Sequence, residues 1–232
     1  MTNKMPRSLA TSCSAIALMS GLLGAEPAFA AGPNSPWYVT GFAGYTQPND
    51  YQFDFINNTT GARFPYKASL DNGYSVGAAV GYRINEYFRV EGEYAYSNTD
   101  FGNSYHADPP GFIGRNPNGD VTTQTLMANV WLGTKLGAVK PYIGGGIGYG
   151  WVDGNLKITN GAGNQFGGDD RGFAYQLGAG LGFQLTNNLD LDLGYRWKKV
   201  NDIKLKSKIN GFHLSSEDFK TQTLQLGLTW RF

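Results

Sequence analysis

The chain has 232 residues, with 19 lysines and arginines against 18 aspartates and glutamates, and only 16% of its residues are charged. A balance this even excludes a nucleic-acid-binding domain, which carries a strong basic excess. Outside the first thirty residues, no uncharged apolar run approaches the roughly 18 residues of a spanning helix, which excludes a helical membrane protein. An aromatic content of 14% and only ten prolines predict a chain made of strands.

Residues 1–30 have the pattern of a secretory signal peptide. Lys4 and Arg7 form a basic start, residues 8–25 are uncharged, and Ala28 and Ala30 are small residues at the two positions that a signal peptidase reads. We therefore expect cleavage after Ala30 and an exported domain over residues 31–232. Cys13 is the only cysteine and precedes this site, so we expect no disulfide in the mature chain.

Eight segments of the mature chain alternate with period two, which is the strand signal. In each of them, large apolar residues and small ones occupy one face, and that face carries no charge. The segments are 37–45, 74–82, 88–96, 126–132, 143–151, 173–185, 189–197 and 224–232. The register is least certain in two of them, because Tyr38 and Phe42 in the first and Met127 and Trp131 in the fourth are large residues on the opposite face.

The opposite faces decide between a soluble β-sandwich or lipocalin-like barrel and a membrane barrel. They hold charged residues together with glycine ladders such as 144–150 and 178–182, taken at alternate positions. Exposed glycine ladders would weaken the strands of a soluble protein. In an inverted barrel the apolar face contacts lipid, aromatic ends lie at the two interfaces, and glycine leaves room for bulky side chains in a narrow lumen.

The connections favour the same fold. Three are short, around 85–86, 137–139 and 186–188, and four are long, at 46–70, 98–122, 153–172 and 200–220. Alternating long and short connections are typical of membrane barrels with short periplasmic turns and long outer loops. The sequence therefore predicts an all-β fold: one eight-stranded antiparallel up-and-down transmembrane barrel with long extracellular loops.

Three motifs resemble the opacity-type surface antigens, which belong with the outer-membrane protein A-like barrels of Gram-negative bacteria: WYVTG at 37–41, LMANV at 126–130 and KPYIGGGIGY at 140–149. The ending Trp230-Arg231-Phe232 is similar to the terminal strand that such proteins present to the barrel-assembly machinery. The resemblance implies an outer-membrane location, with membrane lipid, lipopolysaccharide and that machinery as partners. It names no loop ligand or host receptor, because a fold does not imply a function.

The charged residues on the lumen face are the first candidate site. Buried charges must pair or cost several kcal/mol each, so we expect a salt-bridged plug. The alternative is a narrow, gated path for ions or small solutes that opens when the pairs exchange partners. The residues are Arg89, Glu91, Glu93, Asp190, Asp192 and Arg196.

Two further candidates lie near the last long connection. A run of lysines at the outer end of the seventh segment is a possible contact for lipopolysaccharide phosphates, beside the simpler interpretation of a solvated loop. His213, Ser215 and Glu217 resemble the pattern of outer-membrane lipid A deacylases, but their spacing and loop position favour solvated side chains over catalysis. The lysines are Lys198, Lys199, Lys204, Lys206 and Lys208.

The sequence shows no metal-ligand cluster, phosphate loop or dinucleotide motif, so we expect neither a metal nor a cofactor. The function that follows is a non-enzymatic surface protein for envelope integrity, antigenicity or adhesion. A porin-like channel is the alternative, and a lipid A-modifying enzyme is the third possibility.

Overall fold

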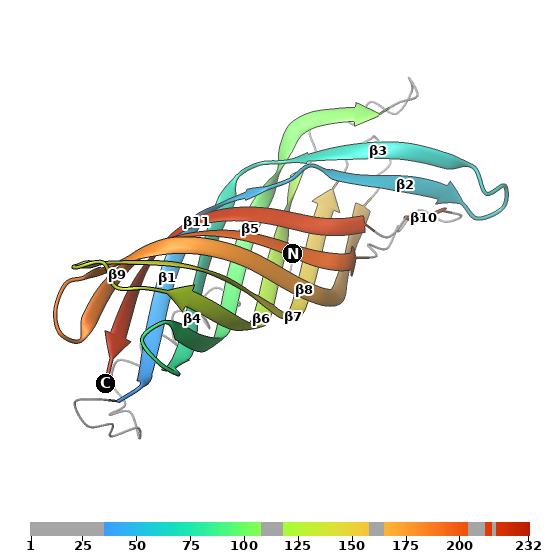
Figure 1. Ribbon diagram of the computed structural model, residues 1–232. Coiled ribbons are helices and arrows are strands. Elements are labelled where there is room, and N and C mark those ends of the chain that lie inside the picture. The colour runs from blue at the N-terminus through green and yellow to red at the C-terminus, as the bar shows by residue number, and fades with distance from the viewer. Residues whose placement is uncertain (1–34, 108–117, 158–164, 204–211, 215–216) are drawn as a thin grey trace, which may run out of the picture. The chain divides into compact units, whose positions relative to one another are not determined.

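The computed structural model describes residues 35–107, 118–157, 165–203, 212–214 and 217–232, so the expected signal peptide and its cleavage site at Ala30 lie outside the described residues. The compact unit Pro36–Arg231 contains eleven strands in one sheet (Figure 1). Within the described ranges, no helix has the length and hydropathy needed to cross a membrane.

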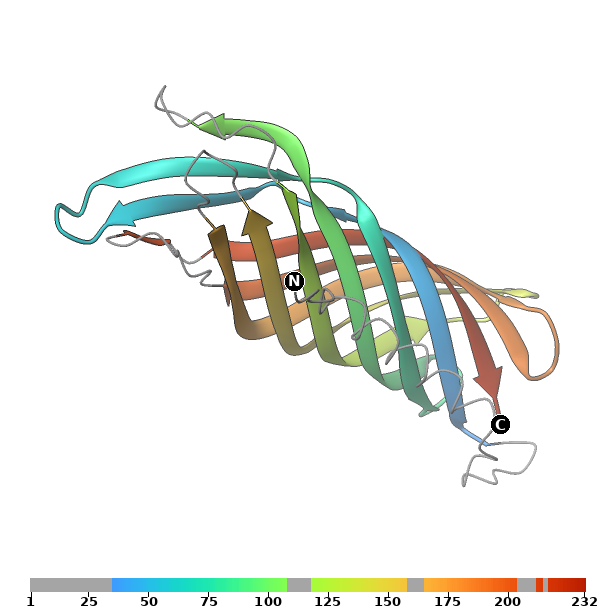
Figure 2. The same cartoon turned by 180° about the vertical axis from the view of Figure 1, so that it is seen from behind.

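Eight of the strands close into an antiparallel barrel (Figure 2). Each pairs with two neighbours, in the order β1, β4, β5, β6, β7, β8, β9, β11 and back to β1. This is the fold that the sequence predicts. The bounds are Trp37–Pro48 for β1, Gly73–Arg83 for β4, Phe88–Ala107 for β5, Asn118–Gly133 for β6, Val139–Lys157 for β7, Gln165–Gln184 for β8, Leu189–Ile203 for β9 and Glu217–Arg231 for β11.

Alternation along the strands sorts the side chains. Large apolar residues such as Ile143 and Leu226 are exposed on the outside, at 63% and 57%, whereas the intervening residues face a filled interior. The two uncertain registers are now settled, because Tyr38, Phe42, Met127 and Trp131 are at most 6% exposed and lie inside. A tyrosine or tryptophan with a polar partner can be buried in a lumen without cost, and this is why size alone left the register open.

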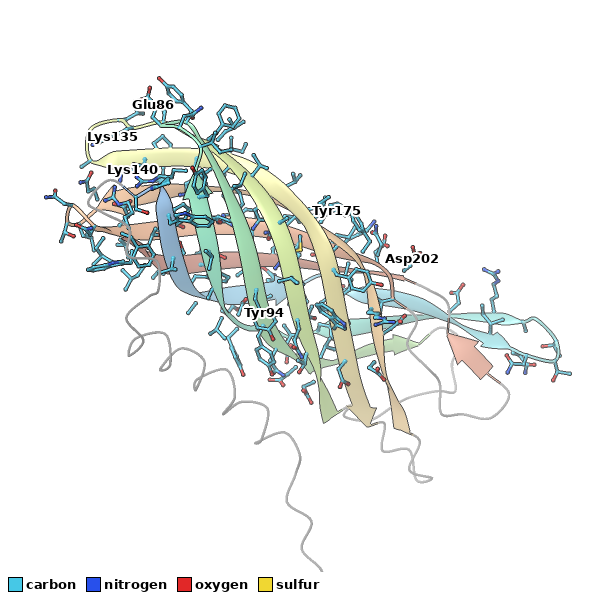
Figure 3. All side chains as sticks on the ribbon, turned by 90° about the horizontal axis from the view of Figure 1, so that it is seen from below. Glu86, Tyr94, Lys135, Lys140, Tyr175 and Asp202 are labelled. Carbon is cyan, nitrogen blue, oxygen red and sulfur yellow. The ribbon has the colours of Figure 1, made fainter. Side chains whose placement is uncertain are left out.

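The three short connections lie at one end of the barrel, which we call the turn end; the opposite end is the loop end. The turns are held by local side-chain bonds: Asn85 accepts from the backbone N–H groups of Tyr87 and Phe88, and Thr186 accepts from those of Asn188 and Leu189. Figure 3 shows Glu86, Lys135 and Lys140 at the turn end and Asp202 toward the other.

Three short strands beyond the eight extend the sheet at the loop end: β2 (Tyr51–Asn57), β3 (Arg63–Leu70) and β10 (Phe212–Leu214). β3 pairs with the outer part of β5, β2 with β3, and β10 with β2. The first long connection is therefore a hairpin. Its turn forms because the Asn57 side chain accepts from the N–H groups of Thr59 and Thr60, and Gly61 adopts a φ of 68°.

Candidate functional site

The lumen is built from large side chains on one set of strands and glycines on the facing or neighbouring set. Gly81 lies under the ring of Tyr38, and Gly144 under Trp131, whose Cε3 would be 2.6 Å from an added Cβ. Gly180 lies under Tyr142 in the same way. The glycine excess in the sequence is thus used where the strands have to approach bulky rings closely.

Glu91 is the centre of the polar network near the turn end. Its two oxygens accept hydrogen bonds from the Tyr38 hydroxyl at 2.6 Å and the Trp131 indole N–H at 2.7 Å. The Arg89 guanidinium lies 3.6 Å from the same carboxylate and stacks 4.5 Å over the Tyr142 ring. Since β1, β5 and β6 supply these groups, Glu91 on β5 is joined to its neighbour β6 and to β1, which lies two strands away on the other side of β4.

Asp192 and Arg196 of β9 form the second part of the network. The Tyr142 hydroxyl donates to Asp192 at 2.7 Å and accepts from Arg196 Nη2 at 3.2 Å. The guanidinium of Arg196 also lies 4.2 Å over the Trp131 ring. Two arginines stacked on aromatic faces fill the cross-section of the lumen with side chains.

Glu93 organises a third layer, closer to the loop end. It accepts from the side-chain amides of Asn129 at 3.0 Å and Gln176 at 3.3 Å, and Gln176 also donates to Asn129 at 2.6 Å. Lys198 Nζ lies 3.5 Å from Glu93 and donates to Thr125 at 2.8 Å. All of these groups are buried or nearly so, as satisfied polar networks in a low-dielectric interior usually are.

Asp190 closes the turn end of the lumen. It accepts from Lys140 at 2.9 Å and from Arg231 at 2.9 Å, so that one carboxylate connects β7, β9 and β11.

An apolar layer, here called the cap cluster, fills the loop end of the lumen. Its members are buried, and between them and the Glu93 layer lies a small cavity of about 20 Å³. The lumen therefore passes from charged to hydroxyl-lined to apolar along its axis. The cap cluster consists of Leu70, Val121, Met127, Val152, Ala174, Val200, Ile203 and Phe219.

The six lumen residues named from the sequence all lie inside the barrel. Arg89, Glu91, Asp192 and Arg196 belong to the network near the turn end, Glu93 to the next layer, and Asp190 to the group that closes the turn end. Sequence reasoning missed their partners Tyr38, Trp131, Tyr142, Asn129 and Gln176, which come from strands distant along the chain. A signal was available, because each of these residues falls on the same alternating face as the charged ones.

The five lysines proposed from the sequence do not share one location. Lys198 differs from the expectation: it has the same parity as Arg196 and points into the lumen. Lys199 points outward, where it pairs with Asp218 and lies 5.7 Å from the Tyr175 ring centroid. Lys220 is its direct cross-strand neighbour. Lys204, Lys206 and Lys208 lie outside the described residues.

The pattern of His213, Ser215 and Glu217, for which solvated side chains are favoured over catalysis, is described only in part. His213 is paired with Ile56 in the β10–β2 ladder, Glu217 is paired with Ile203 at the start of β11, and Ser215 lies outside the described residues. Within the described ranges, no group of three or more histidine, cysteine, aspartate or glutamate side chains could hold a metal ion.

Comparisons with known proteins agree on the architecture. A family model described as "Outer membrane protein beta-barrel domain" matches residues 15–232. An uncharacterized protein of Brucella melitensis biotype 1 is 30% identical over 229 residues, which cover 83% of this chain and 78% of that protein.

Among solved structures, OprG from Pseudomonas aeruginosa matches with a TM-score of 0.56 at 15% identity, over 85% of this chain and 97% of OprG. The outer membrane protease OmpT from Escherichia coli matches with a TM-score of 0.51 at 12% identity, over 87% of this chain and 98% of OmpT. At such identities the two structures show a shared fold and nothing about activity.

Proposed function

The chain belongs to the outer membrane protein beta-barrel domain family, and on that premise we propose that it is a non-enzymatic surface protein of the Gram-negative outer membrane. In this proposal the barrel contributes to envelope integrity, and the loop end faces the outside as a surface antigen or adhesion surface. The observation that carries it is the filled lumen, since a barrel closed by its own side chains serves as a scaffold for its loops.

Two barriers in series support a closed barrel. The network around Glu91, Asp192 and Arg196 fills the part near the turn end, and the cap cluster makes the loop end apolar. A hydrophobic constriction excludes water and ions even where a narrow path exists. An ion would therefore have to break charge-assisted hydrogen bonds and then cross an apolar layer.

Planar-bilayer recording tests the proposal. We expect the folded wild-type protein to give no conductance above the lipid background. The double variant Trp131→Ala with Phe219→Ala, which removes one buried ring from each of the two barriers, is expected to raise the conductance and so to show that the assay detects an opened barrel. A steady wild-type current equal to that of the variant would contradict the closed barrel.

A narrow porin-like channel for ions or small solutes is the second candidate, and one observation favours it. Asp190 is shared by Lys140 and Arg231, and the buried Nε atoms of Arg89 and Arg231 have no hydrogen-bond partner. Such groups have unused hydrogen-bond donors, so they could exchange partners while the lumen opens. The same recording decides, because a gated channel gives discrete current steps in the wild type.

The lysines Lys199 and Lys220 are the outward-facing groups that we propose as lipopolysaccharide contacts. They lie directly opposite each other on β9 and β11, just beyond Trp197, a position in which two like charges repel unless an anion or a carboxylate lies near them. Asp218 supplies one such charge to Lys199. A lipid phosphate at the outer interface would supply another.

Lipopolysaccharide retained through purification measures this contact. We expect a double Lys199→Ala and Lys220→Ala variant to retain several-fold less lipid than the wild type. Lys135→Ala is the matched control, because Lys135 is an exposed lysine in a turn at the other end of the barrel. If all three proteins retain equal amounts of lipopolysaccharide, Lys199 and Lys220 do not bind it.

The absence of catalysis is also a proposal, tested by mass spectrometry of lipid A from cells that carry the wild type or His213→Ala. We expect identical spectra; a mass difference would assign lipid A modification to the chain.

Processing and assembly complete the proposal. We propose that residues 1–30 are removed after Ala30 and that the segment ending in Phe232 is presented to the barrel-assembly machinery. Amino-terminal sequencing of the membrane form is expected to begin at Ala31, and Phe232→Ala is expected to lower the amount of folded barrel in cells. A sequence that starts at Met1, or an unchanged amount, would contradict the respective part.

A further inference from the structure

The hairpin formed by β2 and β3 has two unlike faces. Its register places aromatic residues on one of them, which we call the aromatic face, and none of the paired residues on that face is charged. The other face includes Asp54 and Arg63, which form an ion pair at 3.9 Å and whose side chains are 33% and 71% exposed. The aromatic face holds Tyr51, Phe53 and Phe55 of β2 opposite Ala68, Tyr66 and Phe64 of β3.

The neighbouring strands extend the aromatic face on both sides. The register with β10 adds Phe212 and Leu214, and the register with the outer part of β5 adds Tyr105. Two residues after Ala68 on the same strand, Leu70 is a buried member of the cap cluster. The aromatic face therefore continues, beyond the rim of the barrel, the side of β3 that is apolar in the lumen.

No neighbour of the hairpin lies across its aromatic face in the described part of the chain. The strands in contact with β2 and β3 are their ladder neighbours β5 and β10, together with β11 at the base, where the Asn49 N–H donates to Lys220 O. The hairpin projects beyond the loop end (Figures 1 and 2). Alternation of this kind is typical of strands with one buried face, and a hairpin with no packing partner is at best marginally stable in water.

We propose that the aromatic face is a self-association surface, at which two copies of this chain pack their hairpins face to face. A two-fold contact brings the same patch of both copies together, so an uncharged apolar patch complements itself whereas a charged one would repel itself. The area is sufficient: five aromatic side chains, each of which buries ~150–250 Å² when covered, offer roughly 750–1,250 Å² against the ~800 Å² per partner of a standard interface. The contact lies outside the lumen and does not depend on whether the barrel conducts.

The mass of the folded protein in detergent, measured by sedimentation over a range of protein concentrations, tests the contact. We expect the wild type to be a dimer that dissociates on dilution. Phe53→Ser with Tyr66→Ser changes a directly opposed pair on the aromatic face and is expected to be monomeric throughout. Gln52→Ser with Lys67→Ser changes the adjacent pair on the other face and is expected to dimerise like the wild type. A monomeric wild type, or a dimer retained by the first variant, would overturn the proposal.

Cysteine labelling decides even if the first variant loses the hairpin altogether. Residues 31–232 contain no cysteine, so an introduced one is the only thiol of a chain that starts at Ala31. Ala68→Cys lies on the aromatic face, and Lys67→Cys lies on the other face of the same strand. We expect the rate constant for maleimide labelling to fall several-fold with rising protein concentration for Ala68→Cys only. A rate constant for Ala68→Cys that is independent of concentration overturns the proposal, because any dimer then forms through another surface.

Discussion

Replacing Gly81 by alanine is the sharpest test of how the lumen is packed. Gly81 faces the lumen on β4, and a Cβ atom added there would overlap the ring and hydroxyl of Tyr38. Tyr38 is only 2% exposed, so its ring has little free space into which to move. Any displacement also pulls the hydroxyl away from Glu91, to which it donates at 2.6 Å.

Two costs add up in this variant. Forcing extra atoms into a filled interior costs about 1–3 kcal/mol. Losing a hydrogen bond to a charged group costs about 1.5–3 kcal/mol. The expected loss in the free energy of unfolding is therefore roughly 2.5–6 kcal/mol, which is a large part of the ~5–15 kcal/mol that holds a typical protein folded.

The assay is the shift in gel mobility between unboiled and boiled samples, followed across a urea series. Gly92→Ala is the matched control: the same change on the outward face of β5, where no atom lies within 4 Å of an added Cβ. We expect Gly92→Ala to unfold with the wild type and Gly81→Ala to unfold at much lower urea. Coinciding midpoints for the two variants would refute this account of the glycines.

Three further variants test other parts of the barrel by the same urea midpoint. Glu91→Gln leaves Arg89 without its counter-ion and should cost about 3–5 kcal/mol, whereas Glu86→Gln in an exposed turn should change little; equal effects would contradict the network. Leu226→Arg places a charge on the lipid face and should cost about 2–4 kcal/mol in bilayers. Gly137→Ala, at a φ of 63° with open space around it, should cost about 1 kcal/mol through the backbone alone.

The barrel could be predicted from the sequence because period-two alternation is a local property. Where a strand reads Leu189, Leu191, Leu193 against Asp190 and Asp192, each residue's face follows from its parity. The same rule places Lys198 on the lumen face beside Arg196, whereas the clustering of lysines along the chain also made it a candidate for contact with lipopolysaccharide. The structure agrees with the parity, because Lys198 lies against Glu93 inside the barrel.

What could not be predicted depends on how far apart the strands are in the sequence. Glu93 meets Asn129 and Gln176 because of the stagger of strands around the barrel, and no local pattern encodes that stagger. The hairpin of β2 and β3 was missed for a different reason. The alternation is present, in Tyr51, Phe53 and Phe55 and again in Phe64, Tyr66 and Ala68, but the segment lies in a long connection between two barrel strands. Its turn depends on Asn57 and Gly61, which in such a connection look like ordinary loop residues.

The ion pair between Lys198 and Glu93 has a consequence for the order of assembly. Glu93 lies on β5 and Lys198 on β9, and three strands separate β5 from β9 in either direction around the ring, so the two side chains meet across the lumen. An open sheet that has not yet closed at the β1–β11 seam holds them apart, and it would present these charges to the membrane interior. Closing the seam and burying these charges in the lumen therefore occur in the same step. A partly closed barrel is therefore unstable, and we expect unfolding to proceed in one step without a stable partly open intermediate.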